Sequence, residues 1–207
     1  MAERQDAAST RSETADAVTV IVIGALAAVV VIVAAVLRAV DVFRPGGIAW
    51  TFDVDQVPVD ASLGSETAGV EGFITQALVI APGVNAVSVT AIVLSIVVGA
   101  IAALLVIAAV VFVAFSLLRG RIFVPATARA FDVIGWSIVL GAGAVLFFDT
   151  LGRNGVLAAI GAEDVGADLG AQFWAFAPAW AAGVSVGIVG RAFRRGVRLQ
   201  RDTEGLV

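Results

Sequence analysis

Four ionisable side chains lie close to the ends of long apolar runs: Arg38, Asp132, Asp149 and Arg191. A charge held inside a membrane is costly, so such residues commonly line an ion pathway or take part in a proton relay. All four lie within a few residues of the end of a run, where a side chain can reach headgroups or water. We therefore interpret these charges as structural, and we expect Asp132 to pair with Arg129 or Arg191.

Two pairs of carboxylates could serve in acid–base catalysis or as calcium ligands: Asp53 with Asp55, and Glu163 with Asp164. Calcium takes about six or more oxygen ligands, often from one shaped loop. Neither pair lies in a loop signature of that kind. The pattern favours solvated surface charges, and it predicts no metal site.

The chain contains no Cys, His, Tyr or Lys, and all 13 of its basic residues are Arg. Without Cys and His, zinc, haem and iron–sulfur ligation of the usual kinds are excluded. Ser-His-Asp and Cys-His catalysis and a Schiff-base lysine are excluded for the same reason. We expect a protein that is not an enzyme and holds no cofactor.

The elements that carry these residues are predicted from the apolar runs, since 60% of the 207 residues are hydrophobic. A helix of about 20 apolar residues crosses a bilayer core of about 30 Å. The runs predict a membrane domain over 17–193 with spans at about 17–40, 86–118, 130–151 and 172–193. A polar, mobile tail is expected over 1–16 and a basic tail over 194–207. The predicted fold class is an all-α membrane protein, a four-transmembrane-helix bundle with a small extracellular β-containing loop.

That loop, an outer cap over 41–83, has the period-2 pattern of a strand. Ile48, Trp50 and Phe52 alternate with small or polar residues, which predicts an extended strand over 48–59 with Trp50 and Phe52 packing inward. The segment "VEGFITQALVI" (70–80) is predicted to be its partner strand. An interfacial helix is the alternative for that segment.

The distribution of arginine predicts the orientation. Most of the 13 basic residues lie on the side that holds both termini and the 119–129 loop, whereas most acidic residues lie on the other side. Positive charge marks the cytoplasmic side of a membrane protein. Both termini are therefore predicted to be cytoplasmic, and the heavy use of Arg, Ala, Val and Gly suggests a bacterial plasma membrane.

The basic residues of the cytoplasmic side could also bind something. The link "RGRIFVPATARAFDVIGW" and the C-terminal segment carry Arg119, Arg121, Arg194, Arg195 and Arg198. Such clusters contact anionic lipid headgroups at the inner leaflet, or dock a cytoplasmic regulatory protein. No nucleic-acid partner is expected, and the simpler interpretation is that these residues only set the topology.

The same link, followed after two spans by "FRRGVRLQRDTEGLV", resembles a family of bacterial four-helix integral membrane proteins, the domain-of-unknown-function 2975 family. The shared motifs are an Arg-Gly-x-x-Phe link after the second span and a closing segment matched by Phe193, Gly196, Leu199 and Asp202. The likeness covers residues 86–207 well and the first span only in outline. It implies a fold and a location, and no activity or catalytic residue.

Small residues recur every fourth position along two of the predicted spans. The eight positions are Ala91, Ser95, Gly99, Ala103, Ala175, Ala179, Gly183 and Gly187. Small residues at this spacing allow helix backbones to approach closely. We expect helix packing at Ser95, Gly99, Gly183 and Gly187, with the two stripes facing each other or a second copy of the chain.

Two functions remain open from the sequence. The first is a non-enzymatic accessory or regulatory membrane protein that acts through protein contacts, including homo-oligomer contacts. The second is a carrier or sensor of a small apolar or lipid molecule within the helix bundle. A sensor needs a pocket with a few convergent polar groups, whereas an accessory protein needs exposed interaction surfaces.

Overall fold

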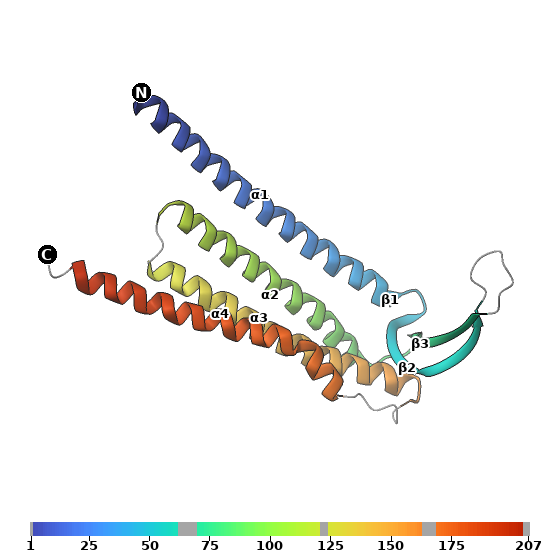
Figure 1. The fold of residues 1–207 in the computed structure, drawn as a ribbon. Helices are drawn as coiled ribbons and strands as arrows, with labels where there is room; N and C mark the ends of the chain where they lie inside the picture. The colour runs from blue at the N-terminus through green and yellow to red at the C-terminus, as the bar shows by residue number, and fades with distance from the viewer. Residues whose placement is uncertain (1, 62–69, 121–123, 163–168, 205–207) are drawn as a thin grey trace.

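The computed structural model describes residues 2–61, 70–120, 124–162 and 169–204, which form four long helices and a small sheet (Figure 1). All four helices are long and apolar enough to cross a membrane. We call the end of the bundle where α1 begins and α4 ends the tail end, and the opposite end, where the sheet lies, the cap end (Figure 1). The helices are α1 (Ala2–Val42), α2 (Ala86–Leu118), α3 (Pro125–Ala159) and α4 (Leu169–Glu204).

Each of the four predicted spans falls inside one helix. The bounds of α2 equal those of its predicted span, whereas α1, α3 and α4 are longer than theirs. The segment expected to be a polar tail, 1–16, is helical from its second residue, because α1 already begins at Ala2. That segment contains no Pro or Gly, so nothing in it terminates a helix. The basic tail is likewise helical as far as Glu204. At α3, Pro125 occupies the first turn, where its missing N–H is not needed.

Part of the predicted loop after the third span is also helical, because α3 continues to Ala159. Gly152 and Gly155 in this part are packing positions and not turn signals. Side chains at Gly152 and Gly155 would collide with Ile92 and Ser88 of α2. Glycine at these positions lets the cap end of α3 lie directly against α2.

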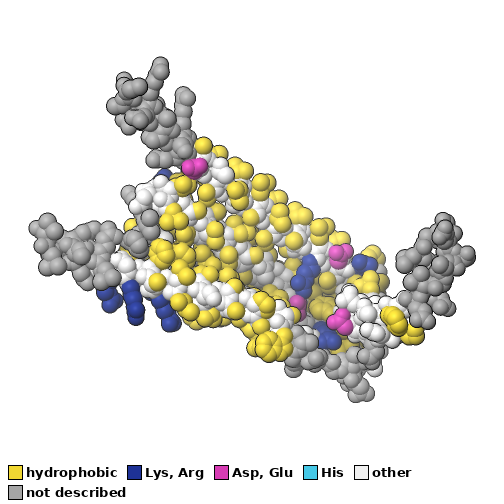
Figure 2. Space-filling model, in the orientation of Figure 1, with side chains coloured by type: hydrophobic (Ala, Val, Ile, Leu, Met, Phe, Trp, Pro, Cys, Tyr) yellow, Lys and Arg dark blue, Asp and Glu magenta, His cyan; other side chains and the backbone are white. Residues whose placement is uncertain are grey.

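The helices follow one another in space as they do in sequence, and α3 is central. It packs against α2 on one side and α4 on the other, whereas α1 packs chiefly against α2 (Figure 1). Apolar side chains cover much of the visible flank of the bundle, and the charged ones gather toward its ends (Figure 2). This distribution is the one that a lipid environment selects.

The cap is a three-stranded antiparallel sheet in the order β1–β2–β3, formed by Phe43–Arg44, Gly47–Ala61 and Val70–Ala81. The predicted strand and its partner are confirmed, and the interfacial helix considered for 70–80 is wrong. Within β2, Ile48 and Phe52 are buried and Trp50 is half-buried, while Thr51 and Asp53 are exposed. The pairing is irregular between Asp53 and Val57.

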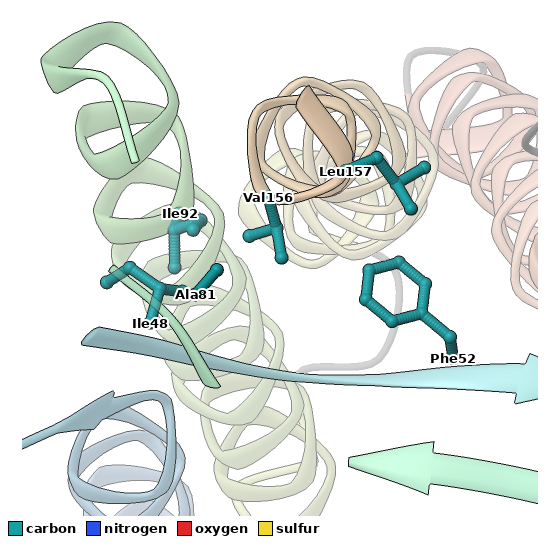
Figure 3. Close-up of a cluster of buried hydrophobic side chains, with 6 residues drawn as sticks. All are labelled: Ile48, Phe52, Ala81, Ile92, Val156 and Leu157. Carbon is teal, nitrogen blue, oxygen red and sulfur yellow. The ribbon is translucent and has the colours of Figure 1, made fainter. Parts of the chain in front are cut away.

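The inner face of this sheet forms the main buried core with the cap ends of two helices (Figure 3). Ile48, Phe52 and Ala81 from the sheet pack with residues of α2 and α3, namely Ile92, Val156 and Leu157. Burying one side chain the size of Phe or Ile stabilises a fold by about 1.5–3 kcal/mol. The cap is therefore anchored to the helices by apolar contact.

Candidate functional site

A polar cluster at the cap end joins three helices. The Arg38 guanidinium on α1 donates from Nη2 to both carboxylate oxygens of Asp149 on α3, at 2.9 Å each. The Ser95 hydroxyl on α2 donates to Asp149 Oδ1 at 2.5 Å. Ser95 is buried, so its hydroxyl needs this partner. The cluster ties α1 and α2 to the central helix.

A second ion pair lies at the tail end, between Asp132 on α3 and Arg194 on α4. The predicted partners of Asp132, Arg129 and Arg191, are therefore wrong. Arg129 lies one turn before Asp132 on the same helix and is exposed. Arg194 reaches Asp132 because close packing of α3 on α4 brings the last turns of α4 beside that carboxylate.

The two ion pairs bracket an apolar segment of α3, residues 133–148, which we call the apolar band. Asp132 and Asp149 are about 26 Å apart along the helix at 1.5 Å per residue. No charged residue lies between them in the sequence. The length of the apolar band is close to the thickness of a hydrocarbon core, about 30 Å.

Of the predicted packing positions, Ser95 is buried and Gly99 and Gly183 lie against α3, whereas nothing lies within 4 Å of a side chain added at Gly187. A methyl group at Gly99 of α2 would lie 3.2 Å from Val145 of α3, and one at Gly183 of α4 would lie 3.0 Å from the Gly135 carbonyl of α3. Both stripes therefore face the central helix, which has its own glycines. At the cap side of α4, Ala175 is exposed and lies outside this contact.

A groove of about 380 Å³ runs between α3 and α4 on the tail half of the bundle. We call it the α3–α4 groove. Its floor is formed by Gly135, Gly183 and Gly187. A methyl group at Gly135 would lie 2.9 Å from the Gly183 carbonyl, so the two backbones are in contact there. Gly187 has nothing within 4 Å of where its side chain would be, which leaves the groove open above it.

The walls and one end of the α3–α4 groove differ in character. The walls are apolar and open sideways, since Trp136 is 63% exposed and Ile188 60%. The tail end of the groove is lined by Asp132, Arg191 and Arg194. The sequence does not identify Trp136 as a groove residue, because its position beside α4 depends on helix packing.

Only some of the arginines predicted to contact lipid or a partner lie close together in the structure. Arg194, Arg195 and Arg198 are exposed on the last turns of α4, where Figure 2 shows basic side chains along the tail end. Arg119 caps the end of α2 and lies over the Phe115 ring, 4.1 Å from its centroid. Arg121 lies outside the residues that the structure describes. The arginines of α4 thus extend the charged end of the groove.

The cap presents an apolar surface on β3, which we call the β3 surface. Its members are exposed side chains on the outer face of the strand: Ile74, Leu78 and Ile80. In the described sheet, β3 pairs with β2 along one edge only. An exposed edge strand with large apolar side chains is a typical site for pairing with another chain.

The carboxylate pairs considered for catalysis or calcium binding have no such arrangement in the part of the chain that the structure covers. Asp53 accepts a hydrogen bond from the Gln76 side chain at 3.0 Å, across the sheet. The side chain of Asp55, and residues Glu163 and Asp164, lie outside the described part. No group of three or more His, Cys, Asp or Glu side chains converges among the described residues.

No family model, no curated protein and no solved structure matches this chain.

Proposed function

We propose that the chain is a non-enzymatic, multi-pass membrane protein that acts by binding another protein through its cap. The observation that carries the proposal is the β3 surface. It combines a strand edge that no described strand covers with large exposed side chains, of which Leu78 is 54% exposed. Backbone hydrogen bonds along an edge supply affinity for an extended segment, and the alternate side chains supply specificity.

The proposal includes the orientation expected from arginine. In this arrangement the four helices cross a bacterial plasma membrane, the tail end is cytoplasmic and the cap lies outside. The positive-inside rule supports it, because exposed Arg119, Arg129 and the arginines of α4 gather at the tail end. Four long apolar helices are also what membership of the domain-of-unknown-function 2975 family would imply, and we retain that membership as part of the proposal.

A photo-reactive amino acid placed on the β3 surface tests the proposed function. Leu78 would be replaced and the protein irradiated in intact cells. Val30 on α1, which is 66% exposed, is a matched apolar position. We expect a discrete cross-linked protein from position 78 and none from position 30.

Two results would contradict the proposal. One is cross-linking of the same proteins, with equal yield, from both positions. The other is a product from position 78 that persists when Ile80, on the same face of β3, is changed to Asp. A charged side chain in an apolar contact leaves an uncompensated charge and should abolish a specific one.

A further inference from the structure

We propose that the α3–α4 groove binds a phospholipid of the surrounding bilayer that has an anionic headgroup. An acyl chain would lie along the glycine floor, and the phosphate would lie beside Arg191. The inference concerns the opposite end of the molecule from the cap and does not rest on the cap's binding a protein.

The dimensions of the groove match one leaflet. It extends along α4 from Gly183 to Arg194, which is about 16 Å at 1.5 Å per residue. Half of a hydrocarbon core is about 15 Å. The charged end of the groove therefore falls at headgroup level, and its glycine floor lies at the depth of the acyl chains.

The shape of the groove suits a flexible chain. The floor is backbone, because a side chain at Gly135 or Gly183 would meet the opposite helix. The walls are the large side chains of Trp136 and Ile188, which stay exposed on the side where lipid would lie. Contact between a methylene chain and such walls gains dispersion energy that a flat helix face would not give.

The charge at the tail end selects the headgroup. Asp132 and Arg194 neutralise each other in an ion pair. Arg191 lines the same end of the groove and forms no ion pair with another residue in the described part of the chain. Arg195 and Arg198 add positive charge nearby, on exposed turns. The end of the groove is therefore cationic, which complements an anionic lipid and not a zwitterionic one.

Native mass spectrometry of the full chain released from detergent micelles tests the proposal. The protein would be titrated with phosphatidylglycerol or with phosphatidylcholine that carries the same acyl chains. One basic residue near a membrane surface changes lipid affinity about fivefold. We expect wild-type protein to bind phosphatidylglycerol at least about fivefold more tightly than phosphatidylcholine.

Two variants separate the headgroup contact from the groove. Arg191→Gln should weaken phosphatidylglycerol binding about fivefold and leave phosphatidylcholine binding unchanged. Arg44→Gln, which removes an arginine at the cap end, is its control. Gly187→Leu should weaken both lipids, because its first added carbon meets nothing within 4 Å and the longer side chain would occupy the groove. Gly143→Leu is the control, since Gly143 also has nothing within 4 Å of its added carbon and does not line the groove.

Three outcomes would overturn the proposal. In the first, Arg191→Gln retains the lipid preference of Arg44→Gln. In the second, Gly187→Leu binds lipid as Gly143→Leu does. In the third, Gly187→Leu converts a dimer into a monomer, which would make the groove a contact between two copies. If Gly187→Leu does not fold, Gly187→Ala should still weaken both lipids to a smaller extent, and an unchanged affinity would count equally against the site.

Discussion

Removing the charge of Arg38 should destabilise the bundle more than removing the charge of its partner. In Arg38→Gln, the Asp149 carboxylate keeps its charge and retains only the Ser95 hydroxyl as a donor. The carboxylate lies about 15 Å along the helix axis before the end of α3, and the short Asp side chain cannot extend from there to water. In Asp149→Asn, the remaining charge is a guanidinium on a long stem about 6 Å from the end of α1, and it can extend to water.

The magnitude follows from the exposure of the two side chains. An exposed ion pair contributes about 0–1 kcal/mol, and removing one partner of a fully buried pair costs about 3–5 kcal/mol. Here the side chains of Arg38 and Asp149 are 47% and 22% exposed. We therefore expect Arg38→Gln to lower the free energy of unfolding by about 2 kcal/mol and Asp149→Asn by about 1 kcal/mol. The double variant leaves no unpaired charge, so its loss in the free energy of unfolding should be only about 1 kcal/mol.

The assay is a titration with sodium dodecyl sulfate in mixed micelles, with helix content followed by far-ultraviolet circular dichroism. Arg44→Gln is the matched control, since Arg44 pairs with Asp41 at 3.6 Å on an exposed surface. Its effect should stay below about 0.5 kcal/mol. The reasoning fails if the double variant is as unstable as Arg38→Gln, or if Asp149→Asn is the more damaging single change.

Three further predictions concern orientation, the cap and helix packing. A cysteine at Thr75, which is exposed on β3, should react with a membrane-impermeant maleimide in intact cells. A cysteine at Ala126, which is exposed at the start of α3, should react only after the cells are opened. Reaction of both cysteines in intact cells would contradict the orientation. Phe52→Ala should destabilise the cap by about 3 kcal/mol, seen as faster proteolysis of the cap with helix content retained; unchanged proteolysis would show that the buried ring does not anchor the cap. Gly183→Leu should lower helix-bundle stability by about 1–3 kcal/mol, because its first carbon would lie 2.7 Å from Val139. Val184→Leu, one residue further on an exposed face, should have little effect, and equal losses from the two changes would argue against close packing at Gly183.

The long helices and the two long strands could be predicted because each rests on local hydrophobicity, whereas the short strand β1 is not predicted. Apolar runs locate the helices, and the alternation around Trp50 locates β2. The ends could not be predicted in the same way. Helices do not stop where the apolar residues stop, and α3 continues past Gly152 and Gly155 because those glycines fit against α2.

The polar contacts could not be predicted, because they join residues far apart in the sequence. Arg38 and Asp149 are recognisable as span-end charges, but only the packing of α1, α2 and α3 brings them to Ser95. Similarly, the glycines of α4 set its register on α3 and so select Arg194, and not Arg191, as the partner of Asp132. Gly99 and Gly183 of the small-residue stripes lie against α3, but a stripe carries no information about which helix lies against it.

The apolar band of α3 has a consequence for the membrane that the protein would favour. With the bundle spanning as proposed, the two carboxylates stand about 26 Å apart, about 4 Å less than an average hydrocarbon core. Tilting would shorten the span further, so the bilayer itself must thin around α3, at a cost of a fraction of a kcal/mol for each ångström of mismatch. Bilayers of short or unsaturated acyl chains, or regions already thinned by other proteins, would lower that cost. Hydrophobic mismatch would thus concentrate the protein in the thinner parts of its membrane.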